Sequence, residues 1–339
     1  MALEINHVAD DLDSIFKIFH ELMIKKVREI LLVSSLYDFC IMEEDGRLSE
    51  RIIHEYRGLN LSQPPRITWV SSAEEALSVL NIKEFDMVIT MPRLAEMVAV
   101  ALGQTIKSKR QDLPVILMTH SALTPDFVPG QSHSRGIDRV FVWSGNTDIL
   151  LALIKNAEDR FNVIHDTAMA GGRVILFVED SPIYASVLLP ILDRAIVLQA
   201  QAVMVEGLNE EHRLLTMRAR PKILYATSLE EARSLFTQFE PYILGVISDV
   251  SFPHNDEIDP DAGINLLSRI KKERFDIPLL LTSSEPSNRK KAAKIPATFI
   301  DKNSPSLLAE VRSFFIEKLG FGDFVFRMPD GREIGRASN

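Results

Sequence analysis

Two stretches decide the fold of this 339-residue chain: residues 173–180 read Arg-Val-Ile-Leu-Phe-Val-Glu-Asp, and residues 244–251 read Leu-Gly-Val-Ile-Ser-Asp-Val-Ser. In each, a short run of aliphatic and β-branched residues leads into one or two carboxylates. Such runs are typical of strands that are buried inside a parallel sheet. The carboxylates are therefore predicted to lie together at one edge of a sheet.

Helical patterns separate these two strands from three others in the same half of the chain. Residues 228–231, Ser-Leu-Glu-Glu, carry the capping signal of a helix start. Strands that alternate with helices form βαβ units, which close as a parallel sheet with helices on both faces. We therefore predict a flavodoxin-like, doubly wound α/β domain over residues 173–320, with strand order 2-1-3-4-5. Its other strands are expected at residues 221–226, 278–281 and 297–300.

The first half of the chain repeats this order of elements. Residues 72–75, Ser-Ala-Glu-Glu, match the helix start of the second half. We predict a second five-stranded, flavodoxin-like domain over residues 28–163, joined to the other by a linker at 164–172. Its strands are expected at residues 29–33, 65–70, 87–90, 114–118 and 139–142.

Both predicted domains are enlarged between their first and second strands, at residues 36–59 and 182–218, where the patterns predict a long helix or a pair of helices. The apolar residues of these helices predict burial against a neighbour, which is either the other half of the chain or a second copy in a homodimer. A third insertion, at residues 252–261, is predicted to be a solvated loop. Its acids are Asp256, Glu257, Asp259 and Asp261.

The two ends of the chain carry patterns of their own. Residues 1–27 predict an amphipathic helix, whose apolar stripe packs on the first domain or pairs with a second subunit. Residues 321–339 contain a hairpin signal around Pro329-Asp330-Gly331. Because a solitary hairpin is marginally stable in water, this segment is interpreted as a tail or as the start of a further, truncated domain.

Composition and charge exclude several classes of function. The chain is 46% hydrophobic and 25% charged, as soluble globular proteins are. Its net charge of -9 argues against a nucleic-acid surface. At the start of the chain, charged residues interrupt the apolar positions, so no apolar run there reaches the length of a signal or membrane segment. The single cysteine, Cys40, fits a reducing cytoplasm. We expect a cytoplasmic protein whose partners are proteins or cations.

The predicted strand ends of the second domain bring Glu179, Asp180, Asp249, Ser283 and Lys302 together, since ligands in such sheets bind beyond the carboxyl ends of the strands. Crowded carboxylates repel one another unless a cation neutralises them, and hard oxygen ligands suit Mg²⁺. Asp249 would attack phosphorus while Lys302 neutralises the developing charge. The Ser283 hydroxyl would then bind the new phosphoryl group and act as a switch.

These residues resemble the motifs of the response-regulator receiver (CheY-like) family. The resemblance implies that Asp180, Asp249 and the backbone carbonyl of Ser251 bind Mg²⁺ directly, whereas Glu179 acts through water. It also implies that Phe299 changes rotamer on activation, and that a histidine kinase or phosphotransfer protein supplies the phosphoryl group. The matching stretches are residues 177–181, 246–250, 278–283 and 299–302, and Asn303 departs from the family by replacing its usual proline.

The first predicted domain keeps the framework and lacks the chemistry. Ser34 and Ser35 replace the acidic pair, Met91 stands at the phosphoacceptor position, and Trp143 stands where the lysine would be, so that Thr119 alone matches. A thioether accepts no phosphoryl group, and the two serines would not hold Mg²⁺. We interpret this half as a pseudo-receiver used for interaction, in which Met91 and Trp143 either fill the vacated pocket, which we favour, or form a new ligand site.

Nearly the whole chain also resembles the N-terminal region of large bacterial phosphoenolpyruvate synthase/pyruvate phosphate dikinase-like proteins. The stretches that carry this resemblance are residues 37–39, 43–46 and 320–326. It implies a missing C-terminal effector domain and no dikinase activity in the residues present.

Three classes of function follow from the sequence. The first is a phosphorylatable module of a two-component phosphorelay, with no enzymatic activity beyond self-phosphorylation from small donors and autodephosphorylation. The second is a phosphorylation-independent scaffold with a vestigial acidic pocket. The third, a haloacid-dehalogenase-like phosphatase, would resemble its family in having a second aspartate two residues after Asp249. Ser251 stands there instead.

Overall fold

The computed structural model describes residues 20–337, apart from 45–47, 59–62, 93, 95–96, 121–135, 203–217, 320–323 and 328–332. Several predictions fall partly outside this range. They are the helix predicted over residues 1–27, of which 1–19 lie outside, the enlargement predicted over residues 182–218, of which 203–217 lie outside, and parts of the motifs at 43–46 and 320–326.

Two five-stranded sheets form the framework, and every neighbouring pair of strands in them is parallel. The first has the order β2-β1-β3-β4-β5 and the second the order β7-β6-β8-β11-β12, so each follows the predicted 2-1-3-4-5 arrangement. The prediction of two flavodoxin-like sheets is confirmed. The strands are β1 (Glu29–Val33), β2 (Arg66–Val70), β3 (Met87–Thr90), β4 (Val115–Thr119), β5 (Arg139–Val142), β6 (Val174–Val178), β7 (Lys222–Ala226), β8 (Ile243–Asp249), β11 (Leu279–Ser283) and β12 (Thr298–Asp301).

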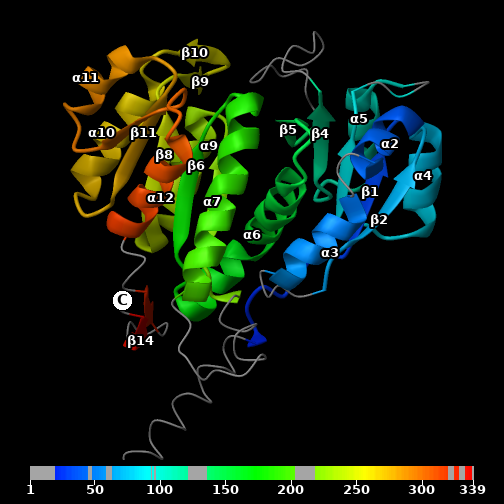
Figure 1. Ribbon diagram of the computed structural model, residues 1–339, viewed down its shortest axis with the longest axis horizontal. Helices are drawn as coiled ribbons and strands as arrows, with labels where there is room; N and C mark the ends of the chain where they lie inside the picture. The colour runs from blue at the N-terminus through cyan, green and yellow to red at the C-terminus, as the bar shows by residue number, and fades with distance from the viewer. Residues whose placement is uncertain are drawn as a thin grey trace, which may run out of the picture.

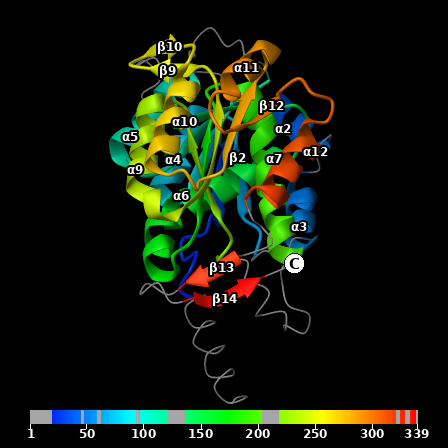
Figure 2. The same ribbon diagram turned by 90° about the vertical axis from the view of Figure 1, so that its left-hand side faces the viewer.

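Helices cover both faces of each sheet (Figures 1 and 2). Ser72 and Ser228 accept the backbone N–H of Glu75 and Glu231, which confirms both predicted helix starts. In the first half the helices are α2 (Leu36–Glu44), α3 (Leu48–Gly58), α4 (Ala73–Ile82), α5 (Ala99–Lys109) and α6 (Asp148–Ala170). In the second half they are α7 (Pro182–Ala202), α9 (Leu229–Phe239), α10 (Ala262–Glu273), α11 (Arg289–Ala292) and α12 (Leu307–Glu317), with short 3₁₀ turns at Glu240–Tyr242 and Pro286–Asn288.

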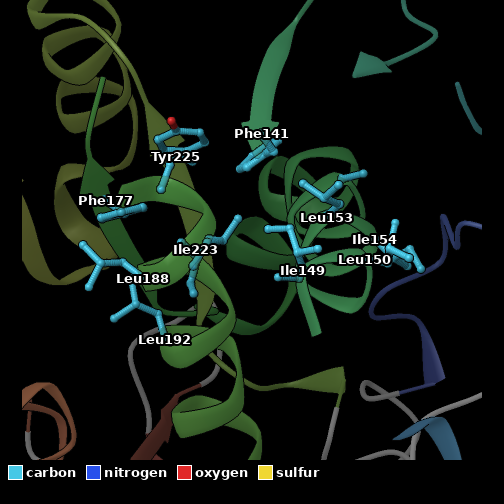
Figure 3. Packing of buried hydrophobic residues seen from close by; sticks show 14 of the residues in the cluster. Phe141, Ile149, Leu150, Leu153, Ile154, Phe177, Leu188, Leu192, Ile223 and Tyr225 are labelled. Atoms are coloured by element: carbon cyan, nitrogen blue, oxygen red, sulfur yellow. The ribbon is translucent and has the colours of Figure 1, made fainter. Parts of the chain in front are cut away.

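The two halves share one hydrophobic core, in which α6 and α7 lie between the sheets (Figure 1). Phe141 of β5 and Tyr225 of β7 face each other across the junction, with ring centroids 6.0 Å apart (Figure 3). Tyr225 also stacks on Phe177 of β6 at 5.3 Å. By length and apolar composition α7 could cross a membrane, but its contacts with α6, β5 and α12 account for that composition in a packed core.

Helix α6 extends through most of the predicted linker at 164–172, so the linker prediction was wrong. The helix continues to Ala170 because its late turns are buried and paired: Asp166 binds Lys222 of β7 at 2.9 Å. Gly171 ends the helix in a left-handed conformation, with φ 61°. Two turns earlier in the helix, Asp159 holds the buried Arg220 at 2.6 and 3.0 Å. Only three residues, 171–173, connect α6 to β6.

The chain before β1 is not helical after His20, which corrects the helix predicted over residues 1–27 within its described part. The backbone N–H groups of Met23, Lys25 and Val27 instead donate to the side chains of α6. Their acceptors are Asp166, Asn162 and Glu158, which are spaced four residues apart on one face of that helix. An extended segment matches this spacing, whereas a helix would use the same N–H groups internally.

The acidic insertion at 252–261 forms a hairpin rather than the predicted loop. Strands β9 (Phe252–His254) and β10 (Glu257–Asp259) pair antiparallel. Asn255 and Asp256 occupy the turn with φ of 53° and 66°, a conformation that these residues tolerate. The C-terminal hairpin prediction is confirmed by β13 (Phe324–Arg327) and β14 (Glu333–Ala337), which also pair antiparallel.

Candidate functional site

The carboxyl ends of the second sheet gather three carboxylates. Asp249 ends β8, which lies between β6 and β11, and Glu179 and Asp180 directly follow β6. One oxygen from each of these three side chains lies within 4.8 Å of the other two. The parallel register that places Val178 beside Ser248 is what brings the acidic pair next to Asp249. The structure therefore brings together the three acids that the sequence singled out.

Lys302 joins this cluster from β12. Its Nζ lies 2.6 Å from Oε2 of Glu179 and 2.8 Å from Oδ2 of Asp249, and its side chain is 2% exposed. The ammonium also lies 4.3 Å from the centroid of the Tyr184 ring, on α7. Tyr184 was missed by sequence reasoning, since an aromatic residue in an apolar helix carries no signal of its own. One ammonium faces three carboxylates, so the cluster keeps an excess of negative charge.

The protonation of the cluster reflects this excess. Burial raises the pKa of Glu179 to about 8, with Lys302 opposing the rise and Asp249 adding to it. Burial and the charge of Asp249 raise the pKa of Asp180 to about 6. Burial would lower the pKa of Lys302, but the charges of Glu179 and Asp249 outweigh it and raise that pKa. Oxygen ligands under mutual repulsion fit a hard divalent cation such as Mg²⁺.

The backbone around Asp249 is fixed by a glycine that the sequence analysis missed. Gly263 lies at the start of α10, and a Cβ on it would lie 1.9 Å from the carbonyl oxygen of Asp249. Its N–H donates to the carbonyl of Val250 at 2.9 Å. Only glycine permits this close approach of the helix to the strand end. Ser251, the predicted carbonyl ligand, lies in the bend between β8 and β9.

The two neighbouring hydroxyls at the end of β11 have different partners. Thr282 donates to the carbonyl of Ser248 at 3.3 Å, inside the sheet. Ser283 instead accepts from the backbone N–H of Glu285 at 3.1 Å and from the side-chain amide of Asn288 at 3.0 Å. The hydroxyl predicted to act as a switch is thus held by the loop that leads to α11.

Phe299 and Asn303 lie on either side of Lys302. The guanidinium of Arg289, at the start of α11, lies 5.0 Å from the centroid of the half-buried Phe299 ring. The side-chain amide of Asn303 donates to the carbonyl of Ser284 at 3.0 Å. Asn303, where a proline was expected by resemblance, therefore ties the loop after β12 to the loop after β11.

The corresponding strand ends of the first sheet are closed by apolar side chains. Met91 is 1% exposed and Trp143 is 4% exposed, and both belong to the shared core. Ser34 and Thr119 are buried as well, and the Trp69 indole donates to the Ser34 hydroxyl at 3.1 Å. This burial agrees with the interpretation that Met91 and Trp143 fill the place of a pocket.

At the rim of the first sheet Ser35 donates to Asp38 at 2.7 Å, and Asp38 pairs with His120 at 2.9 Å. Among the residues that the structure describes, the only cluster of three or more potential metal-binding side chains is the one around Asp249.

No protein-family profile matches the sequence, and no curated protein matches it. Among solved structures, the chain is similar to the signal receiver domain of an HD domain-containing protein from Pseudomonas fluorescens Pf-5, at 22% identity over 40% of this chain and 90% of that one, with a TM-score of 0.30. It is similar to the response regulator TrrA from Thermotoga maritima in complex with Mg(2+)-BeF, at 22% identity over 38% of this chain and 98% of that one, with a TM-score of 0.30.

A third similar structure is the receiver domain of sensor histidine kinase PA1611 from Pseudomonas aeruginosa PAO1, with a magnesium ion in its active-site cleft. It shares 18% identity over 39% of this chain and 98% of that one, with a TM-score of 0.30. These three structures are signal receiver or response-regulator proteins. The assignment of the fold here rests on the strand order of the two sheets.

Proposed function

We propose that the second half of the chain is a receiver module that accepts a phosphoryl group on Asp249 with the help of Mg²⁺. One observation supports this most: three carboxylates within 4.8 Å of one another lie at the carboxyl ends of parallel strands, with a buried lysine bound to two of them. Charged side chains in such a buried group are costly to fold, and pKa shifts of this size are concentrated at functional sites.

The reaction is a displacement at phosphorus. An oxygen of the Asp249 carboxylate forms the new P–O bond while the bond to the donor's leaving group breaks, and the electron pair leaves with that group. Lys302, 2.8 Å from Asp249, is placed to neutralise the oxygens of the transferred group. Asp180, Asp249 and the carbonyl of Ser251 would hold Mg²⁺, which supplies positive charge to those oxygens.

The donor class follows from the same chemistry. A phosphohistidine of a kinase or phosphotransfer protein, or a small acyl phosphate, carries a phosphoryl group that is reactive enough to be passed to a carboxylate. The first half has no such cluster in its described part, so within this proposal it serves as a pseudo-receiver for assembly. Regulation of an attached or partner effector would then be the output.

Intact-mass spectrometry after incubation with acetyl phosphate and Mg²⁺ tests the proposal. The wild type should gain one phosphoryl group, and Asp249→Ala should gain none. Asp256→Asn is the matched control, because Asp256 is an exposed acid of the neighbouring hairpin. Its backbone has a left-handed conformation, which asparagine also tolerates.

The control should be phosphorylated as the wild type is. A wild type that gains no mass, and whose Mg²⁺-dependent melting temperature does not respond to beryllofluoride, would contradict the proposal. Equal gain in the wild type and Asp249→Ala would place the phosphoryl group elsewhere and would favour the scaffold alternative.

A further inference from the structure

A second concave site lies on the first half of the chain, at the opposite end of its sheet from Met91 and Trp143. It is a groove of about 980 Å³, formed where β1, β3, β4 and β5 begin and bordered by α6. Figure 1 shows α6 beside β4 and β5 on the side of the junction. This volume is at the upper end of the range found for small-molecule pockets.

The groove is basic although the chain as a whole is acidic. Eight Lys and Arg residues line it, against four Asp and Glu residues, whereas the chain carries a net charge of -9. A local excess of cations in an anionic protein raises the local concentration of anions. The excess of positive charge in the groove therefore distinguishes it from the carboxylate cluster of the second half.

Three of the four carboxylates in the groove are already bound. Asp86 accepts the backbone N–H groups of Arg28 at 2.7 Å and Glu29 at 2.9 Å. Asp138 accepts the N–H of Val115 at 2.7 Å and pairs with Lys107 at 2.6 Å. Glu84 pairs with Arg110 at 2.7 Å. These acids are therefore occupied in holding strand starts and two of the cations.

Four other cations of the groove have no such partner. The side chains of Lys25, Lys26, Arg28 and Lys109 form no hydrogen bond or ion pair within the described residues. Burial lowers the pKa of Lys26 to about 8, and only Glu158 among its neighbours opposes the shift. A bound anion would relieve this penalty, because it favours the charged form of the ammonium.

Phe161 is a half-buried aromatic side chain in the wall of the groove, and Phe85, Leu113 and Phe141 lie almost fully buried behind it. A ligand that satisfies both parts needs several negative charges at one end and a planar, largely apolar ring at the other. We propose that this groove binds a nucleotide, with its phosphates among Lys25, Lys26, Arg28 and Lys109 and its base against Phe161.

Two further cations connect the groove to the second half. Arg139 and Arg160 line the groove and both reach Glu231 of α9. Arg139 also donates to the carbonyl of Tyr225 at 2.9 Å. A nucleotide phosphate in the groove would compete with Glu231 for these guanidinium groups, so binding is expected to alter the junction between the halves.

Titration of the full chain with a fluorescent N-methylanthraniloyl ATP, followed by competition with unlabelled ATP, tests this proposal. Saturable binding with Kd below ~1 mM is expected. Arg28→Glu and Lys109→Glu should each weaken binding by about tenfold or more, because each replaces an attractive charge by a repulsive one. Lys290→Glu and Lys294→Glu are matched controls, since both residues are exposed on or beside α11 and lie outside the groove.

The outcomes separate cleanly. Displacement of the probe by tripolyphosphate alone, at higher concentration than ATP, would support the division into phosphate and base subsites. The proposal is overturned if neither ATP nor tripolyphosphate binds, or if the control variants lose as much affinity as the groove variants. Circular dichroism and melting temperature should be unchanged in all four variants, because these side chains have no bonded partner to lose.

Discussion

The two sheets of this protein have the same strand order and differ at their carboxyl ends. In the second, Glu179, Asp180 and Asp249 form a cluster, and the ammonium of Lys302 binds Glu179 and Asp249. In the first, Met91 and Trp143 occupy the equivalent strand ends and are buried in the core. The fold therefore requires the apolar runs before these positions, and it does not require the charges after them.

The buried charged residues of the second half reduce the stability of the fold. Burial raises the pKa of Glu179 to about 8, which shows that its ionised form is disfavoured even beside Lys302. The thioether and indole of the first half carry no such penalty. A chain selected for stability alone would have apolar side chains at the strand ends of both sheets. The charged side chains of the second half therefore point to chemistry there.

The largest effect is expected from Lys302→Met. Removing this ammonium leaves the Asp249 carboxylate, which is 14% exposed, without its cation and leaves Glu179 without its partner, which should lower the free energy of unfolding by about 3 kcal/mol. Mg²⁺ should restore part of the loss by binding the native carboxylates. Urea denaturation with and without Mg²⁺ measures both, and Lys318→Met, at an exposed position, should change stability by less than about 0.5 kcal/mol. A Lys302→Met variant as stable as the wild type without Mg²⁺ would show that the charges are not coupled.

Met91→Asp probes the first half in the same way. The new carboxyl would be buried without a lysine or a metal, and should lower the free energy of unfolding by about 1 to 3 kcal/mol. Isothermal titration should show no added Mg²⁺ site, because Ser34 and Ser35 supply no carboxylate. Met91→Leu keeps the volume and should cost less than about 1.5 kcal/mol. New Mg²⁺ binding in Met91→Asp would mean that the first half retains more of a metal site than its side chains indicate.

Asn288→Ala addresses the hydroxyl of Ser283, whose counterpart in the first half, Thr119, is buried. The amide of Asn288 holds the Ser283 hydroxyl at 3.0 Å, so its removal should cost about 1 kcal/mol of stability. The freed hydroxyl should bind beryllofluoride at Asp249 more readily, and a lower apparent Kd is expected. Ser283→Ala is the comparison, since it should lose that affinity. If Asn288→Ala and Ser283→Ala weaken beryllofluoride binding equally, Asn288 supports the site rather than restraining the hydroxyl.

The last prediction concerns the Lys26 and Lys302 ammonium groups of the two halves, whose pKa values move in opposite directions. The pKa of Lys302 is raised by its carboxylates despite burial, whereas burial lowers the pKa of Lys26 from 10.5 to about 8. Lys26→Met should therefore stabilise the protein at neutral pH. The gain should shrink as the pH rises from about 8 to 10.5, since over that interval the folded wild type has lost a proton that its unfolded chain retains. Thermal melts across this range measure the difference, and a gain that grows with pH would contradict the assignment.

Much of the fold could be predicted from sequence because the strands are nearly continuous apolar runs and the helix starts are explicit. Residues 174–178 and 243–249 are strands in the structure because parallel strands buried on both faces must be apolar along their length. The acids and the lysine of the site were equally visible, since each follows such a run directly.

What could not be predicted depends on contacts between distant segments. Asn288 and Tyr184 are ordinary residues until the fold places them beside Ser283 and Lys302. The extended segment before β1 is set by Glu158, Asn162 and Asp166, which lie more than 130 residues away. No local propensity encodes a hydrogen bond of that separation, and the sequence pattern alone favours a helix there.

Helix α6 has a consequence for how the chain unfolds. It closes the first sheet, and its residues also pack against α7 and β7 and bind Arg220 and Lys222. A break at Gly171 would leave each half with an uncovered apolar face and unpaired buried charges. The two halves should therefore melt in a single cooperative transition, although each has a complete sheet of its own.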